Sequence, residues 1–364
     1  MAFFILKESM LKGKKVFISP LDWGLGHTTR CIPIITSLQK LGCKVWIGVN
    51  STQKSLLKQE LTDVNYIPFE GYNVSYASSI SMVFKMGIQI PKILNRIRSE
   101  KKELEKLIDR YDFDLVISDN RFGLYSKKIP SIYISHQINI QAPFGVDKIL
   151  HQFHKKYIDN FTQCWIPDYK NNQESLGGKL SHGGIKDNYH YLGLLSRFHS
   201  PTTDTNFEYQ YLAIVSGPEP QRSIFEKQII SFFESKNEKC AILGGKPLEK
   251  KSESIKNIDY YSHLDTKKMF ELISLSKNII SRPGYSSIMD LTVLQKPVLF
   301  IPTSGQTEQE YLARYYFKHY NIQYAAQNKL NNRINESNFN ILPFKQAENL
   351  EETVKRLISK LSFS

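Results

Sequence analysis

Short apolar runs alternate with amphipathic segments along the chain. In the first half, a run at 15–19 predicts a strand, and isoleucine and leucine at helical spacing predict a helix through 32–41. A second strand follows at 44–49. Further apolar runs predict strands at 64–69, 114–118, 129–135 and 162–167. The order strand, glycine-containing turn, helix and strand is typical of a nucleotide-binding α/β domain.

The second half of the chain repeats this pattern. Strands are predicted at 211–216, 240–243, 258–261, 278–280 and 297–301, with helices at 223–233, 269–276 and 286–294. Apolar residues at helical spacing predict two more helices, at 306–317 and 345–361. The predicted fold is therefore α/β, with two Rossmann-like domains facing each other across a cleft. Such clefts commonly bind ligands.

The polar, proline-containing segment 196–208 lacks periodicity and marks the boundary between the halves. We expect an N-terminal Rossmann-like domain at 1–195, a linker at 196–208 and a C-terminal Rossmann-like domain at 209–343. The final segment, 344–364, is expected to hold a helix that packs across the domains.

The segment 79–110 reads as largely helical and changes character along its length. Its first part is rich in Met, Phe and Ile, whereas its second part is strongly charged. We favour a helix that packs on its own domain and has a solvated continuation. The alternative is a membrane-surface helix that is apolar on one side and basic on the other.

The formal net charge of +13 requires an explanation, because cytosolic enzymes do not need it. Nucleic acids, anionic membranes and phosphorylated ligands are all attracted by such a charge. The sequence has no recognisable nucleic-acid module, so we expect no nucleic-acid partner. An anionic membrane surface together with a phosphorylated ligand ranks first, and a lysine-rich composition from an AT-rich genome is the alternative.

No apolar run approaches the ~20 residues that a membrane span needs. The apolar opening, 1–6, is too short for a signal peptide, and its lysines follow rather than precede it. The four cysteines have no metal-ligand spacing. We therefore expect a cytoplasmic protein, or one that is peripheral on the inner face of the cytoplasmic membrane, with no cofactor and no metal.

The connection at 282–287 between a strand and a helix is the first candidate site. Gly284 permits close approach to the backbone, and Ser286 or Ser287 can cap the helix. Free N–H groups and the positive end of the helix dipole favour a phosphate there. Asp290, about one turn further along, can accept hydrogen bonds from sugar hydroxyls. An ordinary capped helix with an acidic residue in its first turn is the alternative.

Three strands of the first half deliver polar residues to one edge of the predicted sheet. His27 lies in the glycine turn after the first strand, while Asp119 and His136 follow two others. The carboxyl ends of parallel strands meet at the same edge, where substrates bind. Each residue alone suits a structural hydrogen bond, but together they predict a site.

Three motifs in order along the chain carry a resemblance to a known family. They are GLGH at 24–27, SRPGYSSIMD at 281–290 and FIPTSGQTEQEY at 300–311. Together they resemble the GT-B glycosyltransferases of the family 28 type, which include the lipid II-forming UDP-GlcNAc transferase of peptidoglycan synthesis. The resemblance covers nearly the whole chain. It implies a GT-B fold, with an acceptor domain first and a nucleotide-sugar domain second.

The resemblance also implies roles for individual residues. It places the diphosphate at the turn around Gly284, the ribose hydroxyls on Asp290 and the donor sugar near Gln309. Glu310 stands where the relative has a second glutamine, which leaves the identity of the donor sugar open. The segment around His263 resembles the one that covers the uracil ring. The candidate nucleotide-sugar contacts are Gly26, Gly217, Arg222, Gly244, His263, Leu264, Arg282, Gly284, Ser286, Ser287, Asp290, Gln306, Gln309 and Glu310.

By the same resemblance His27 is the candidate general base, and His136 and Gln137 lie in a segment that resembles the family's stretch by the acceptor. Asp119, from its place at the sheet edge, completes the candidate catalytic residues with His27 and His136. Imidazole, with a reference pKa of about 6.5, can take the acceptor proton at neutral pH. Arg222 and a helix N-terminus can stabilise the departing diphosphate without a metal. The sequence has no DxD pair placed for one. Direct displacement would invert the anomeric centre.

These features predict an inverting, metal-independent glycosyltransferase. The expected donor is a UDP-sugar, either UDP-GlcNAc or another UDP-hexose or hexosamine. The expected acceptor is a lipid-linked or cell-envelope glycan, such as lipopolysaccharide. One alternative is a UDP-sugar epimerase of the same fold, although such an enzyme needs acid and base carboxylates around the sugar. The other is a non-catalytic nucleotide-sugar-binding partner in an envelope assembly complex.

Overall fold

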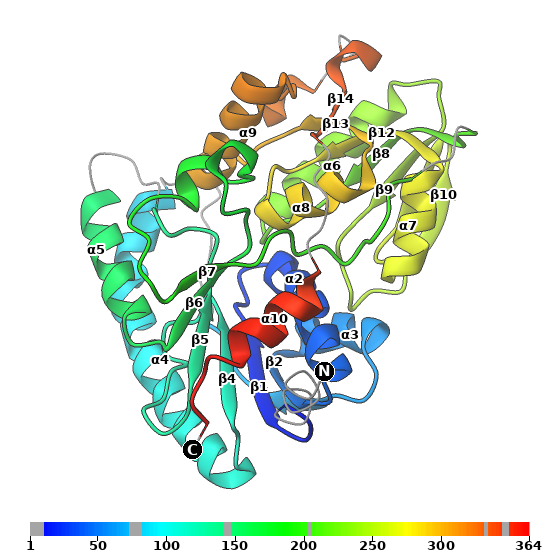
Figure 1. Cartoon of the computed structure of the whole chain (residues 1–364). Helices are drawn as coiled ribbons and strands as arrows, with labels where there is room; N and C mark the ends of the chain where they lie inside the picture. The colour runs from blue at the N-terminus through cyan, green and yellow to red at the C-terminus, as the bar shows by residue number, and fades with distance from the viewer. Residues whose placement is uncertain are drawn as a thin grey trace.

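The computed structural model describes residues 11–72, 82–140, 147–202, 206–330, 334–343 and 349–363. Two α/β halves are each built around one sheet, and the chain returns at its C-terminus to the half where it began (Figure 1). The apolar opening at 1–6 and the start of the predicted long helix at 79–81 lie outside the described residues. The predicted α/β class with two Rossmann-like domains is confirmed.

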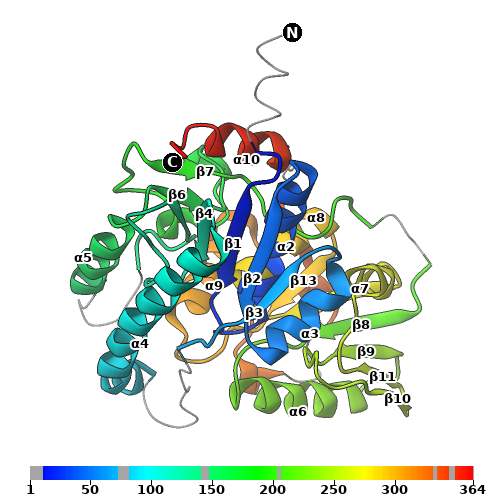
Figure 2. The same cartoon turned by 90° about the horizontal axis from the view of Figure 1, so that it is seen from below.

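The first sheet is fully parallel, with the strand order β3-β2-β1-β4-β5-β6-β7. Its strands are β1 (Lys15–Pro20), β2 (Lys44–Val49), β3 (Asn65–Pro68), β4 (Leu115–Asp119), β5 (Ser131–Ile134), β6 (Gln163–Ile166) and β7 (Tyr189–Tyr191). Its helices are α2 (Leu25–Lys40), α3 (Ser51–Glu60), α4 (Met82–Tyr111) and α5 (Asp147–Ile158). α4 and α5 cover one face, and α2 and α3 cover the other (Figures 1 and 2). Both faces are therefore buried, which explains the near-continuous apolar runs of the central strands.

The second sheet has the order β10-β11-β9-β8-β12-β13-β14. Its strands are β8 (Tyr209–Ile214), β9 (Cys240–Leu243), β10 (Ser252–Ile255), β11 (Ile258–Tyr261), β12 (Ser276–Ser281), β13 (Pro297–Phe300) and β14 (Asn340–Ile341). Its helices are α6 (Gln221–Glu234), α7 (Thr266–Ser274), α8 (Tyr285–Leu294) and α9 (Thr307–Tyr320). The inner strands run parallel, whereas the edge strands β10 and β14 are antiparallel to their neighbours. The sequence pattern did not predict either edge strand.

The glycine turn of the first half is shorter than the sequence suggests. α2 begins at Leu25, so Gly26 and His27 belong to its first turn rather than to a preceding loop. Gly24, with a φ of 108°, makes the reversal between β1 and the helix, a conformation that glycine adopts without strain. His27 is therefore held on a rigid helix.

The start of α8 also differs from the prediction. Gly284 is the cap residue and no side chain caps the helix, so the expected cap by Ser286 or Ser287 is wrong. Ser286 Oγ instead donates a hydrogen bond of 2.9 Å to the carbonyl oxygen of Gly26. That bond joins the beginnings of α8 and α2, one from each half of the molecule.

The C-terminal helix α10 (Leu350–Ile358) packs on the first half, beside α2 (Figure 1). Val354, Leu357 and Ile358 are buried there. The side-chain amide of Gln163, on β6, donates to the carbonyl oxygen of Leu357 at 3.1 Å. The predicted apolar stripe thus belongs to a helix that returns from the second half to the first.

The described side chains of α4 support the interpretation as a core-packed helix. Ile97, Leu104 and Ile108 are buried, the last two against Phe17 and Phe113. The side chains of 82–88, on which the membrane-surface alternative depends, lie outside the described residues. Among the helices of the described chain, none is long and apolar enough to cross a membrane.

Candidate active site

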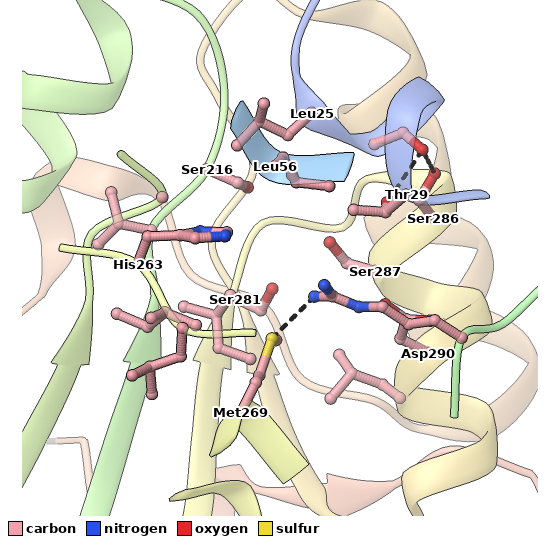
Figure 3. Close-up of a pocket in the computed structure, with 18 of the residues that line it drawn as sticks. Leu25, Thr29, Leu56, Ser216, His263, Met269, Ser281, Ser286, Ser287 and Asp290 are labelled. Carbon is pink, nitrogen blue, oxygen red and sulfur yellow. Dashed lines mark hydrogen bonds and ion pairs between the residues drawn. The ribbon is translucent and has the colours of Figure 1, made fainter. Parts of the chain in front are cut away.

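A pocket opens between the two halves at the carboxyl ends of β8, β9 and β12 (Figure 3). Ser216 and Ser281 line it from the second half, and Leu25 and Thr29 line it from the first. Gly245, with a φ of +66°, passes close to the neighbouring strand, where an added Cβ would lie 2.6 Å from the carbonyl oxygen of Val215. The pocket therefore occupies the position where parallel α/β sheets bind their ligands.

The first turns of α8 form one wall of this pocket. Ser286, Ser287 and Asp290 all line it, as the sequence predicted. The hydroxyl of Ser196 donates to Asp290 Oδ1 at 2.7 Å. Burial raises the pKa of Asp290, against the opposing effect of Arg197. The helix N-terminus offers free N–H groups to an anion, and Asp290 offers a carboxylate to hydroxyl donors.

Arg197 brings a positive charge into the pocket, and sequence reasoning missed it. Its side chain is 8% exposed and lies 3.7 Å from Asp290 Oδ2 and 3.8 Å from Glu60 Oε1. Nη2 points at the sulfur of Met269 at 2.8 Å, and Nε makes no hydrogen bond with any residue that the structure describes. The residue lies in the predicted linker, where a polar, aperiodic pattern does not distinguish a pocket residue from a spacer.

His263 and Leu264, both predicted site residues, line the pocket from the segment after β11. Burial, reinforced by Arg197, lowers the pKa of His263 to about 4, so the imidazole is neutral near pH 7. Its Nε2 is buried and has no hydrogen-bond partner in the described part of the chain. A neutral ring nitrogen at this position can donate to or accept from a ligand, depending on its tautomer.

His27, Asp119 and Arg30 form a buried cluster next to the pocket. His27 Nδ1 lies 2.7 Å from Asp119 Oδ1, and Arg30 Nε donates to Asp119 Oδ2 at 2.5 Å. Burial acts to raise the pKa of Asp119, but Arg30 and His27 outweigh it and hold that pKa well below its usual range. Burial lowers the pKa of His27, and Arg30 lowers it further, against the opposing effect of Asp119. Asp119 is therefore ionised, and His27 favours its neutral form.

His136 connects this cluster to the second half of the molecule. Its Nδ1 lies 2.9 Å from Arg30 Nη1, and its Nε2 lies 2.8 Å from Glu308 Oε1, on α9. The amide of Gln137 donates to the other carboxylate oxygen of Glu308. The ring of His136 also stacks on Tyr285, at a centroid separation of 4.1 Å. The three predicted catalytic residues therefore share one network, to which the structure adds Arg30 and Glu308.

Two predicted cations lie outside the pocket. Arg222 is held by Glu219 and by Glu226, whose Oε2 accepts a hydrogen bond of 2.9 Å. Arg282 is buried over the ring of Phe225, and its guanidinium donates to the carbonyl oxygen of Ile301 at 3.0 Å. Arg222 is paired with two carboxylates of its own half, so its expected pairing with a diphosphate does not fit this arrangement, and Arg282 keeps only its Nε without a partner among the described residues.

The remaining predicted residues shape the loops around the pocket. Gln306 Oε1 accepts from the backbone of Gln309, whose own side chain accepts from the backbone of Thr303 at 2.8 Å. Glu310 likewise accepts from the backbone of Gly305 at 2.8 Å. None of these three predicted side chains lines the described pocket. At the other predicted glycine positions, the neighbours of Gly217 and Gly244 line it instead, and Gly284 begins α8.

Comparisons with known proteins agree with this geometry. Residues 224–361 match the glycosyltransferase family 28 C-terminal domain. The chain is 23% identical over 322 residues to a protein of Methanosarcina acetivorans described as an uncharacterized glycosyltransferase, covering 81% of each chain. A relative from Methanosarcina mazei with the same description is 23% identical over 314 residues, again covering 81% of each chain.

Solved structures share the fold at low sequence identity. The glycosyltransferase SnogD of Streptomyces nogalater is 11% identical, with a TM-score of 0.58 over 96% of both chains. Arabidopsis thaliana UGT89C1, solved with UDP-L-rhamnose, is 10% identical, with a TM-score of 0.58 over 96% of this chain and 94% of that one. Acinetobacter baumannii MurG is 11% identical, with a TM-score of 0.50 over 95% and 90%. The domain match, the described relatives and the two-domain architecture together indicate a glycosyltransferase with a GT-B fold.

Proposed function

We propose that this enzyme transfers a sugar from a UDP-sugar to a lipid-linked or cell-envelope glycan, with inversion at the anomeric carbon and without a metal. The observation that carries the proposal is the position of one pocket. It lies between the halves, with Asp290 and the α8 N-terminus on one side and the His27 cluster beside it. This arrangement would bring the donor and the base to one cleft.

The wall formed by α8 supports the donor part of the proposal. The diphosphate would lie at the α8 N-terminus, where backbone N–H groups and the helix dipole favour negative charge. Arg197 would add a cation, taking the role that the sequence suggested for Arg222. Asp290 would accept hydrogen bonds from ribose hydroxyls, and His263 would face the base. The α8 N-terminus and Arg197 would supply positive charge where the leaving diphosphate gains negative charge.

The His27 cluster supports the catalytic part. Nδ1 of His27 faces Asp119, so Nε2 is the nitrogen left to take a proton. The acceptor hydroxyl would lose its proton to Nε2 as its oxygen attacks the anomeric carbon. The bond between that carbon and the diphosphate oxygen breaks, and its electron pair leaves with the nucleoside diphosphate. Attack opposite the leaving group inverts the anomeric centre.

The base and the sugar of the donor are open to test, because GT-B neighbours were solved with different nucleotides. UGT89C1 was solved with UDP-L-rhamnose, and a spinosyn rhamnosyltransferase with thymidine diphosphate. We favour uridine on the resemblance of the segment around His263. The acceptor class follows from the same resemblance and from the net charge of +13, which favours an anionic membrane surface.

The test is a thermal-unfolding titration with UDP, GDP, TDP and UDP-sugars, with and without EDTA. A ligand at ~100 times its dissociation constant adds about 2.7 kcal/mol to the stability. We expect UDP compounds alone to raise the melting temperature, EDTA to leave the shift unchanged and Asp290→Asn to reduce it. Lack of stabilisation by every nucleotide would contradict the donor site, and loss of the shift in EDTA would contradict metal independence.

A further inference from the structure

Arg30 contacts the other side chains of the catalytic cluster through all of its guanidinium nitrogens. No sequence motif indicated a role for it. It lies on α2 one turn after His27, and its side chain is 1% exposed. Nε and Nη2 both donate to the carboxylate of Asp119, one to each oxygen. Nη1 reaches 2.9 Å from the Nδ1 of His136. One guanidinium therefore contacts every residue that the sequence proposed as catalytic.

The contacts of the two imidazoles favour one tautomer of each. A guanidinium has no acceptor, so Nδ1 of His136 must accept from Arg30, and the neutral ring then carries its proton on Nε2, facing Glu308. Nδ1 of His27 lies 2.7 Å from Asp119 Oδ1 and donates to it. The 2.9 Å approach of Arg30 Nη2 to that same Nδ1 is then a contact between two donors that share one acceptor oxygen.

Because Asp119 Oδ1 accepts hydrogen bonds from both Arg30 and His27, Asp119 has a smaller effect on the pKa of His27. A lone carboxylate beside an imidazole favours the protonated ring, which reduces the fraction of the ring that is neutral and able to accept a proton near neutral pH. Here the carboxylate is neutralised by a guanidinium that is itself within 3 Å of the ring. In a buried site such charges interact strongly. Asp119 can therefore orient His27 without holding a proton on it.

We propose that Arg30 is a positioning residue that acts on His27 in two ways, through Asp119 and directly from beside the ring, and so keeps His27 neutral and correctly oriented for proton transfer. This inference rests on the proposed role of His27 as general base. The groups that face His27 are Arg30 from its own helix, Asp119 from β4, His136 from the segment after β5 and Glu308 from α9. Of these, Arg30 is the permanent cation, and its removal leaves the carboxylates unopposed.

The direct test is the pKa of His27, followed by NMR of histidine ring signals between pH 4 and pH 9. His27→Gln assigns the signal. Removing the guanidinium with Arg30→Gln removes a charge that disfavours protonation, so the pKa of His27 should rise by about one unit or more. Arg30→Lys keeps the charge and should leave that pKa close to its wild-type value. An unchanged pKa in a folded Arg30→Gln variant would overturn the proposal.

A second measurement applies if Arg30→Gln fails to fold. Replacing both members of a buried ion pair is tolerated better than removing one. The double variant Arg30→Met, Asp119→Asn is therefore compared with Asp119→Asn alone. The proposal requires a higher pKa of His27 in the double variant, because only the single variant keeps the cation beside the ring. Equal values would contradict it.

Enzyme kinetics add a functional readout. If His27 must be neutral to act, the acid limb of kcat/KM moves to higher pH in Arg30→Gln and stays near its wild-type position in Arg30→Lys. A purely structural role would lower the rate without moving the limb. The NMR titration needs no turnover, so failure of His27 as a base and failure of the role of Arg30 are distinguished.

Discussion

At the scale of single residues, three buried arginines of the second half and the linker differ in whether they line the pocket. Arg197, Arg222 and Arg282 are all largely buried. Nε has no hydrogen-bond partner among the described residues in both Arg197 and Arg282, but of the three only Arg197 lines the pocket. The other two are held by neighbours within the second half. A phosphate-binding role therefore fits Arg197.

This distinction predicts unequal effects on donor binding. Arg197→Gln should weaken UDP binding by about tenfold to a hundredfold, because a hydrogen bond to a charged group contributes ~1.5–3 kcal/mol. Arg222→Gln is the matched control and should leave the affinity within about twofold. Isothermal titration calorimetry with UDP measures both, alongside a thermal-unfolding check of each variant. A larger loss in Arg222→Gln would show that the diphosphate contacts that arginine instead.

The residues that sequence reasoning missed share a physical reason. Arg30 and Glu308 can be recognised only in the folded chain. Arg30 lies 89 positions from its partner Asp119, and Glu308 lies 172 positions from its partner His136. Asp290, Ser286 and Ser287 were predictable, since one local strand-to-helix turn places them. Gln309 and Glu310 matched a motif, yet their side chains shape their own loop.

At the scale of elements, apolar runs predicted the central strands well, because both faces of each sheet are covered. The edge strands β10 and β14 were not predicted, because their residues are mostly polar and half-exposed or exposed. β10 pairs with β11 through a tight turn in which Lys256 has a φ of 55°. The first residues of helices were less predictable than the strands. Gly26 and His27 were predicted to lie in a turn but belong to α2, because a glycine-rich segment suggests a loop even where a helix starts within it.

The packing of α10 on the first half predicts a stability effect far from the cleft. Leu357 is 2% exposed, and truncating such a residue leaves a cavity that costs about 2–5 kcal/mol. Leu357→Ala should therefore lower the free energy of unfolding, measured by urea denaturation, by that amount. Arg356→Ala, an exposed neighbour on the same helix, should change it by less than about 0.5 kcal/mol. Equal effects would mean that α10 does not pack on α2 in solution.

At the scale of the whole molecule, several polar contacts join the two halves. Ser286 donates to the backbone of Gly26, and the hydroxyl of Tyr285 donates to the carbonyl oxygen of Pro167 at 2.9 Å. Glu308 accepts from His136 and Gln137 of the first half. These contacts place the first turn of α8 beside the first turn of α2, an arrangement that the proposed transfer requires.

The central claim is glycosyl transfer with His27 as base, and the most direct test is a transfer assay. Purified protein is incubated with a labelled UDP-sugar and a membrane extract, and His27→Gln is compared with the wild type and with His190→Gln, on β7. UDP binding is measured in parallel.

We expect acceptor-dependent transfer by the wild type and by His190→Gln. In His27→Gln the rate should fall by about 10²–10⁴-fold while UDP affinity is retained. UDP release that does not depend on acceptor, or transfer by His27→Gln at the wild-type rate, would contradict the account.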